Sequence, residues 1–172
     1  MASFQLTDDL LTGIDDVDAQ HRILFELAND VVETSDEKKG RAFFERTSTF
    51  LKEYVAYHFA SEEMVMLEHH YPKVEAHSQR HASLRAELAT LVLDPNADGA
   101  IKKLNAQLCF FIEDFIAQHV RTWDREMAAF YRAHNIRISL PSASTLAQAD
   151  PKSAVVPADI DAILANRKSR PR

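Results

Sequence analysis

Residues 43–71 read FFERTSTFLKEYVAYHFASEEMVMLEHHY, and this stretch decides the fold class because it contains neither glycine nor proline. A long stretch without these two helix-breaking residues favours an α-helix. Its apolar side chains Phe43, Phe50, Tyr54 and Val65 belong to one helical stripe. The pattern predicts an amphipathic helix over residues 41–69, which the pair Tyr71-Pro72 ends.

Three further stretches show the same helical periodicity, over residues 18–34, 73–93 and 100–134. Their apolar stripes consist of Leu24, Ala28 and Val31; Leu84, Leu88 and Leu91; and Ile101, Leu104, Leu108, Phe111 and Phe115. Short polar turns connect the four stretches. We therefore predict an all-α protein, an up-down-up-down antiparallel four-helix bundle with an extended N-terminal arm and an irregular C-terminal tail.

The composition changes near residue 135, where prolines appear among Ser, Ala and Thr. We assign residues 1–134 to the bundle and residues 135–172 to a proline-containing tail, with room for one short helix near residues 158–166. The tail carries six Lys/Arg and three Asp, a net charge of +3. Because the whole chain has a net charge of −6, residues 1–134 carry −9. The tail is read as mostly flexible, and the alternative is a docking element for the acidic bundle or for a partner protein.

Composition excludes several classes of protein. An overall charge of −6 argues against nucleic acid as a partner. The single cysteine, Cys109, excludes an internal disulfide framework and a cysteine-rich metal site. The longest apolar runs are shorter than a bilayer requires, so we expect no membrane partner. We see no secretory signal at the N-terminus, and we expect a cytoplasmic protein.

Histidines fall on the apolar stripe of every predicted helix: His21, His58, His77, His81 and His119. Two pairs, His58 with Glu62 and His77 with His81, have the i, i+4 spacing that places side chains one above the other. Burying five imidazoles without partners would cost several kcal/mol, because each brings polar nitrogens that need hydrogen bonds. A metal site would satisfy them together. The other three histidines lie at helix ends and are interpreted as ordinary polar residues.

The donor set indicates which metal this site would hold. Five imidazoles exceed what one tetrahedral zinc takes, and mixed imidazole and carboxylate ligation suits iron. Glu62 is a candidate bridge between two ions, and Asp124 is the nearest acidic residue after His119. Asp124 lies five positions after His119, which places it about 140° around an ideal helix from His119. We therefore predict a π-bulge or a loosened turn between the two residues.

Four pieces of the chain together resemble the hemerythrin family, in its single-domain bacterial form, the bacteriohemerythrins. The pieces are Thr12-Gly-Ile-Asp-Asp-Val-Asp-Ala-Gln-His21, His58-Phe-Ala-Ser-Glu62-Glu63, Tyr71-Pro72 ahead of His77-Ser-Gln-Arg-His81, and His119-Val-Arg-Thr-Trp-Asp124. The resemblance covers about residues 5–134, and all of the family's ligand positions hold the expected residue types in order.

The resemblance implies a centre of two iron ions with a bridging oxo or hydroxo group. The implied metal ligands are His77, His81 and His119 on one iron, His21 and His58 on the other, and Glu62 and Asp124 as bridges. Counting about six positions for each iron leaves one position open, on the iron with two histidines. Dioxygen would bind end-on there, and the candidate lining is apolar: Leu24, Phe25, Phe59, Ile116 and Val120.

The predicted function is therefore reversible dioxygen binding, as an oxygen carrier, store or local supplier, and not an enzyme activity. Two alternatives remain open: a dioxygen or redox sensor acting through a partner, and a di-iron redox enzyme that handles peroxide or nitric oxide. The oligomeric state is left open. Hydrogen-bond partners are expected to fix the tautomers of the ligand histidines, and the candidates are Gln20, Asp18 and Glu63.

Overall fold

The protein is all-helical in the computed structural model, which describes residues 4–33, 41–91 and 100–142. The main helices are α1 (Asp15–Glu33), α2 (Arg41–Glu68), α3 (Val74–Thr90) and α4 (Ala100–Phe110), and a short 3₁₀ turn at Asp8–Leu10 precedes them. The α4 helix continues through a π-helical segment at Phe111–Ile116, α5 (Ala117–His119), a second π-helical segment at Val120–Asp124, and α6 (Arg125–Ala133). No strand occurs among these described residues.

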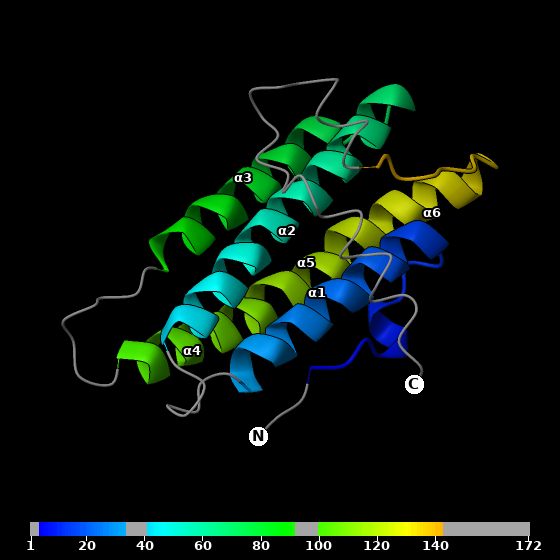
Figure 1. Cartoon of the computed structure of the whole chain (residues 1–172). Coiled ribbons are helices and arrows are strands. Elements are labelled where there is room, and N and C mark those ends of the chain that lie inside the picture. The colour runs from blue at the N-terminus through cyan, green and yellow to red at the C-terminus, as the bar shows by residue number, and fades with distance from the viewer. Residues whose placement is uncertain (1–3, 34–40, 92–99, 143–172) are drawn as a thin grey trace.

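The helices form a bundle, as the sequence predicts. Figure 1 shows α1, α2, α3 and the continuous rod from α4 to α6 lying side by side. Contacts join α1 to α2, α2 to α3, and α1 to α4. The structure contains a helix within each of the four predicted stretches, with ends that differ by a few residues. The α1 helix begins three residues earlier than predicted, and its first turn holds Asp15, Asp16 and Asp18, which suit the positive end of the helix dipole.

Two helices end in the same hydrogen-bonded motif. After α2, the Tyr71 N–H donates to the Met66 carbonyl at 2.9 Å, and His70 adopts a left-handed φ of 51°. After α6, the Ile136 N–H donates to the Tyr131 carbonyl at 2.9 Å, and Asn135 has a φ of 53°. Both are Schellman motifs, which reverse the chain at a helix end. The second one sends residues 136–142 back toward the bundle.

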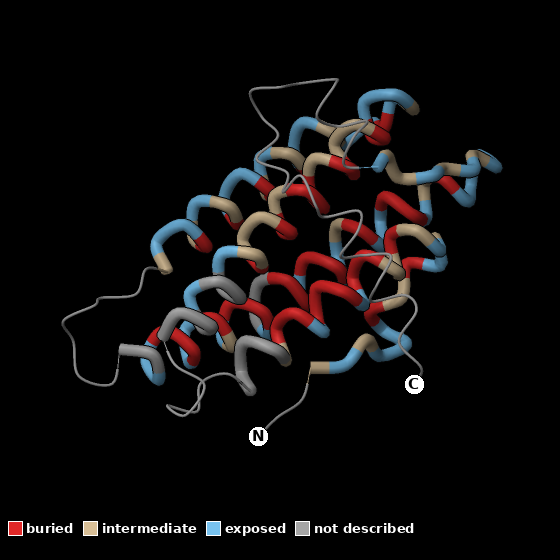
Figure 2. The backbone as a smooth tube through the Cα atoms, viewed as in Figure 1, coloured by how far each residue is buried: buried red, intermediate tan, exposed pale blue. Residues whose placement is uncertain are grey.

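Buried residues lie on the faces that the helices turn toward one another (Figure 2). A large apolar core includes Leu24, Leu51, Leu84 and Leu108, and a smaller apolar cluster consists of Val65, Met66, Tyr71, Met127 and Tyr131. Along α2, the buried polar residues His58 and Glu62 lie between residues of the large core and residues of the smaller cluster. The buried polar groups therefore form a layer in the bundle with apolar residues on both sides.

Part of the sequence prediction falls outside what the structure describes. Residues 143–172, with the short helix predicted near residues 158–166, lie outside the described residues. The same holds for the side chains of four stripe residues: Val31, Phe43, Ile101 and Phe115.

The N-terminal arm is held by hydrogen bonds to the helices. The Asn29 side chain donates to the Phe4 carbonyl at 2.9 Å and accepts from the Phe4 N–H at 2.8 Å. Arg121 pairs with Asp9 at 2.6 Å. These contacts fix the arm against α1 and against the rod that carries α5.

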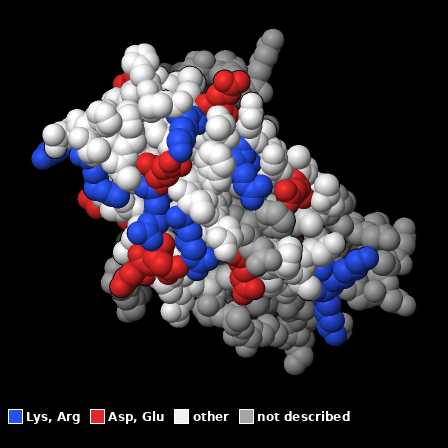
Figure 3. Space-filling view, turned by 180° about the vertical axis from the view of Figure 1, so that it is seen from behind, with Lys and Arg blue, Asp and Glu red and all other residues white. Residues whose placement is uncertain are grey.

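Charged side chains of both signs are interspersed on the face shown in Figure 3, where acidic and basic groups lie next to one another. Lys73 and Glu126 pair on the surface, as do Arg121 and Asp9. Among the described residues on this face, basic side chains alternate with acidic ones. None of the described helices is both long enough and apolar enough to cross a membrane.

Candidate metal centre

The structure brings the seven predicted ligand residues together in the interior of the bundle. Every one of them is at most 2% exposed: His21 from α1, His58 and Glu62 from α2, His77 and His81 from α3, His119 from α5, and Asp124 at the end of the second π-helical segment. They form two overlapping groups, and within each group the ligand atoms lie within 4.8 Å of one another. The first group holds His77, His81 and His119, the second holds His21 and His58, and both include Glu62 and Asp124.

The histidines of each group point their Nε2 atoms at one another. The Nε2 atom of His119 lies 3.2 Å from that of His77 and 2.9 Å from that of His81. In the second group, the Nε2 atoms of His21 and His58 are 3.1 Å apart. Two unprotonated nitrogens at this distance have nothing to attract them to each other. Such convergence is the arrangement expected around a cation that all of them bind.

The two carboxylates divide their oxygens between the two groups. Asp124 Oδ1 lies 3.1 Å from His77 Nε2 and 3.0 Å from His119 Nε2. The other oxygen, Oδ2, lies 3.2 Å from His21 Nε2. Glu62 repeats the pattern more loosely, with Oε2 3.4 Å from His81 Nε2 and Oε1 3.7 Å from His58 Nε2. A carboxylate in this position can bind two ions, one through each oxygen.

The π-helical segment Val120–Asp124 explains how Asp124 reaches the site. In an α-helix a residue five positions after His119 would point about 140° away from it. The extra residue in the π-helical turn returns Asp124 to the same face, where its Oδ1 lies 3.0 Å from His119 Nε2. The structure thus has the π-bulge that the spacing predicts. The first π-helical segment, Phe111–Ile116, has no corresponding signal in the sequence analysis.

Two of the three residues expected to orient the histidines do contact them. The Nδ1 atom of His58 lies 2.8 Å from Gln20 Oε1, and the Nδ1 atom of His81 lies 2.9 Å from Glu63 Oε1. Glu63 also accepts a hydrogen bond from Arg85 at 3.1 Å. Each contact keeps the proton on Nδ1 and leaves the Nε2 lone pair facing the interior.

The third expected residue, Asp18, has a different role. Its Oδ1 atom accepts hydrogen bonds from the backbone and hydroxyl of Thr12, at 2.8 and 2.7 Å, and its Oδ2 atom accepts from the Gly13 N–H at 3.0 Å. Gly13 needs its conformational freedom here because its φ is +78°. Asp18 therefore holds the turn before α1 and does not contact a ligand histidine in the described structure.

Several buried atoms of the cluster have no hydrogen-bond partner, and this tests whether a metal fits. Both oxygens of Glu62 are among them. Burial of polar atoms without partners costs about 1–3 kcal/mol each, and more for charged groups. Cations would satisfy the carboxylate oxygens and the converging Nε2 atoms together. The donor set fits a metal of the iron type, which accepts imidazole and carboxylate ligands.

Burial also sets the protonation of the cluster. It holds the pKa of His58 and that of His81 well below the usual 6.5, so both imidazoles are neutral at pH 7. Burial, with Asp124 nearby, raises the pKa of Glu62 well above its usual 4.5. Burial opposes ionisation of Asp124 as well, but His119 and hydrogen bonds from the surrounding histidines hold its pKa well below 3.8. The chain without metal therefore keeps one carboxylate ionised and the other protonated.

These shifts predict how the stability of the metal-free protein depends on pH. Below pH 6.5, His58 and His81 are protonated in the unfolded chain and neutral in the folded chain. Above pH 4.5, Glu62 is protonated in the folded chain and ionised in the unfolded chain. Between pH 6 and pH 5 the unfolded chain therefore binds about one proton more, and stability falls by about 1 kcal/mol as the pH drops across that interval.

Urea unfolding of the chelator-treated protein between pH 5 and 8 measures this profile. We expect stability to fall as the pH drops from 6 to 5. Stability that stayed constant or rose over that interval would contradict the low pKa assigned to His58 and to His81.

The five apolar residues predicted to line a dioxygen pocket are all buried in the large core: Leu24, Phe25, Phe59, Ile116 and Val120. Phe59 has the most direct contact with the cluster. Its ring stacks on the His81 ring at 4.0 Å with an interplanar angle of 8°. The same ring lies 5.7 Å from the His58 ring and 5.6 Å from the His119 ring, so Phe59 borders both groups.

The sequence analysis assigned no role at the cluster to two residues that lie near it. The ring of Trp123 lies 5.6 Å from the His77 ring, and the ring of Tyr71 lies 6.4 Å from it. Burial raises the pKa of Tyr71 to about 12, so its hydroxyl stays protonated. The sequence contained a signal for Tyr71, since the Tyr71-Pro72 pair precedes the first histidine of α3.

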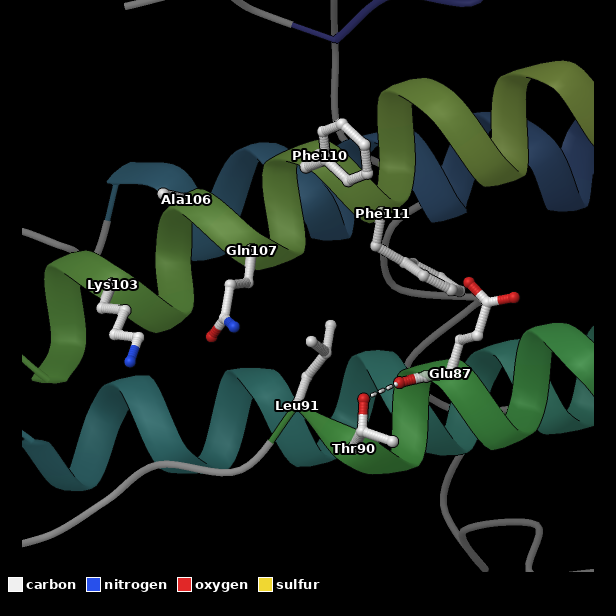
Figure 4. Close-up of a pocket in the computed structure, with 8 residues that line it drawn as sticks. All are labelled: Glu87, Thr90, Leu91, Lys103, Ala106, Gln107, Phe110 and Phe111. Carbon is white, nitrogen blue, oxygen red and sulfur yellow. Dashed lines mark hydrogen bonds between the residues drawn. The ribbon is translucent and has the colours of Figure 1, made fainter.

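A surface pocket of about 470 Å³ lies between the C-terminal end of α3 and α4, away from the cluster. Figure 4 shows Leu91, just after α3, and Gln107, from α4, pointing into it. Apolar atoms dominate its lining, which includes the exposed ring of Phe110. It contains none of the predicted ligand or lining residues, so the chemistry of the chain is concentrated at the buried cluster.

Comparisons with known proteins point to the same chemistry. A family model described as the hemerythrin HHE cation binding domain matches residues 12–131. A bacteriohemerythrin of Clostridium acetobutylicum is 28% identical over 126 residues, which cover 72% of this chain and 97% of that protein. A bacteriohemerythrin of Stenotrophomonas maltophilia is 31% identical over 136 residues, 78% of this chain and 85% of that protein. No solved structure matches the chain significantly.

Proposed function

Because the chain belongs to the hemerythrin family, we propose that it binds dioxygen reversibly at a non-haem di-iron centre, as an oxygen carrier, store or local supplier. The observation that carries the proposal is the pair of overlapping donor groups that share Glu62 and Asp124. Each of these carboxylates directs one oxygen toward either group, so each can bind two adjacent ions, one through each oxygen.

In this proposal the donor groups bind unequally. His77, His81 and His119 would hold one iron, His21 and His58 would hold the other, and Glu62 and Asp124 would bridge them together with an oxo or hydroxo group. The second iron then keeps one open position, at which dioxygen would bind end-on. When bound, the two ferrous ions supply the electrons that reversible dioxygen binding needs.

The side chains of this protein have three tasks at such a centre. The buried imidazoles stay neutral, as the low pKa of His58 and that of His81 indicate, and so remain available as ligands without deprotonation. Phe59 and the other apolar lining residues would exclude water from the open position. Gln20 and Glu63 orient two of the ligand histidines through their Nδ1 atoms. Exclusion of water from the open position would favour holding dioxygen.

The proposal includes the antiparallel up-down-up-down order of the four rods. It is supported by the contacts of α1 with α2, of α2 with α3, and of α1 with α4, and by the delivery of ligands from all four rods to one site. We also propose that the protein works in the cytoplasm and that dioxygen is its small-molecule partner. A protein partner, if one exists, would bind through the C-terminal tail.

Oxygen uptake by the anaerobically reduced, iron-loaded protein tests the proposal. We expect one dioxygen taken up per chain and the same amount released when the gas phase is replaced by argon. Uptake without release, or uptake that continues with added reductant, would favour a di-iron redox enzyme or a sensor that responds by oxidation.

A further inference from the structure

The segment that follows α6, residues 136–142, is anchored to the bundle at two places. Ile136, Ile138 and Leu140 pack against the smaller apolar cluster. The Ser139 hydroxyl and the Leu140 N–H then donate to Asp16 Oδ2 at 2.7 and 3.1 Å, next to the start of α1. The chain is thereby carried from the end of α6 to the outer side of α1 and α2.

At the end of this segment, the Pro141 carbonyl accepts a hydrogen bond from the hydroxyl of Tyr57 at 3.1 Å. The same hydroxyl accepts one from Gln20 Nε2 at 3.3 Å. The other end of the Gln20 amide, Oε1, lies 2.8 Å from Nδ1 of the ligand histidine His58. Tyr57 is 3% exposed and Gln20 is 7% exposed, so water competes little with these bonds.

The direction of every bond in this chain follows from its last member. A carbonyl oxygen only accepts, so Tyr57 must donate its single proton to Pro141. The Tyr57 oxygen can then only accept from Gln20, which requires the NH₂ end of the Gln20 amide to face Tyr57. The carbonyl end of that amide consequently faces His58 and can only accept. His58 must therefore carry its proton on Nδ1, and its Nε2 lone pair faces the cluster.

We propose that Tyr57 and the Pro141 carbonyl are positioning groups for the metal centre, which act through Gln20 to fix the tautomer and orientation of His58. The effect on the metal centre rests on the proposed function, whereas the tautomer of His58 is measurable without iron. The consequence is that a segment beyond the predicted end of the bundle at residue 134 supports the iron that has two histidines. Loss of a residue that orients a metal-bound histidine typically weakens metal binding by about 10–100-fold.

Tyr57→Phe tests the proposal, and Tyr54→Phe is its matched control. Tyr54 lies on the same helix, is also buried, and donates its hydroxyl to the backbone carbonyl of Gln20 at 3.1 Å, outside the chain that ends on His58. Both variants lose one buried hydroxyl. In Tyr57→Phe the Gln20 amide loses its acceptor and is free to turn over, whereas in Tyr54→Phe its orientation is unaffected.

The first measurement is the pair of ¹⁵N chemical shifts of the His58 ring in metal-free protein at pH 8. We expect the Nδ1–H form in the wild type and in Tyr54→Phe, and a mixture with the Nε2–H form in Tyr57→Phe. The second is the release of iron to a strong chelator. We expect one of the two irons to leave about 10–100-fold faster from Tyr57→Phe and at the wild-type rate from Tyr54→Phe.

An unchanged His58 tautomer and iron release in Tyr57→Phe, or equal changes in Tyr57→Phe and Tyr54→Phe, would overturn the proposal. Neither result depends on whether the protein binds dioxygen.

Discussion

If the centre holds two irons as proposed, we expect replacement of His119 with Ala to lower the iron content of the reconstituted protein from two ions per chain to one or fewer. His119 is the centre of the first donor group, because its Nε2 atom lies 3.2 Å from His77 Nε2, 2.9 Å from His81 Nε2 and 3.0 Å from Asp124 Oδ1. Alanine removes one of three imidazoles from that iron. It also removes one of the imidazoles that hold the pKa of Asp124 low, so both effects weaken metal binding.

Iron is measured colorimetrically after anaerobic loading and removal of free metal. His134→Ala is the matched control, since His134 is exposed and its ring donates to the Phe130 carbonyl at the end of α6. We expect the control to keep two irons per chain. Two irons in His119→Ala would remove this residue from the set of ligands.

Replacing Glu62 with Met has two opposite effects. We expect the metal-free protein to become more stable by about 1–3 kcal/mol, because an apolar side chain of similar length replaces a buried carboxyl group without hydrogen-bond partners. Neither Glu62 oxygen has a hydrogen-bond partner, and burial raises the pKa of Glu62 well above 4.5. At the same time the variant loses one of the two bridges, and we expect the second iron to be lost. A gain in stability with a loss of metal is the signature of a residue retained for function.

The neighbouring residue gives the opposite sign and serves as the comparison. Glu63 accepts from His81 at 2.9 Å and from Arg85 at 3.1 Å, so Glu63→Met leaves both without their partner. We expect this variant to lose about 1–3 kcal/mol. Urea unfolding of the two metal-free variants measures the difference. A Glu62→Met protein that is less stable than wild type would show that Glu62 has a structural role.

Most of the predicted site followed from the spacing of residues along single helices. The i, i+4 pairs His58–Glu62 and His77–His81 are set by helix geometry alone, and a continuous apolar stripe identified the face on which they lie. The awkward spacing of His119 and Asp124 was itself informative, because only a π-helical turn reconciles it with a shared site, and the structure has that turn. The structure brings together each of the three pairs that local spacing singled out: His58 with Glu62, His77 with His81, and His119 with Asp124.

Relations between distant segments could not be predicted in the same way. Gln20 contacts His58 across 38 positions of the chain, and the sequence offered Asp18 as an equal candidate. The sequence analysis assigned no role to Tyr57, and the bond from Tyr57 to Pro141 spans 84 positions. The turn at Asn135 decides where residues 136–142 run, and no periodic pattern reports that direction. Such contacts depend on how helices pack, which one sequence does not specify residue by residue.

The measurement that tests the central claim most directly is the visible absorption spectrum of anaerobically reduced, iron-loaded protein before oxygen, after oxygen, and after oxygen removal. The account predicts a charge-transfer band that appears with dioxygen, disappears when dioxygen is removed, and returns over repeated cycles. Prompt and permanent conversion to an oxidised di-iron spectrum, with no reversible band, would contradict reversible dioxygen binding.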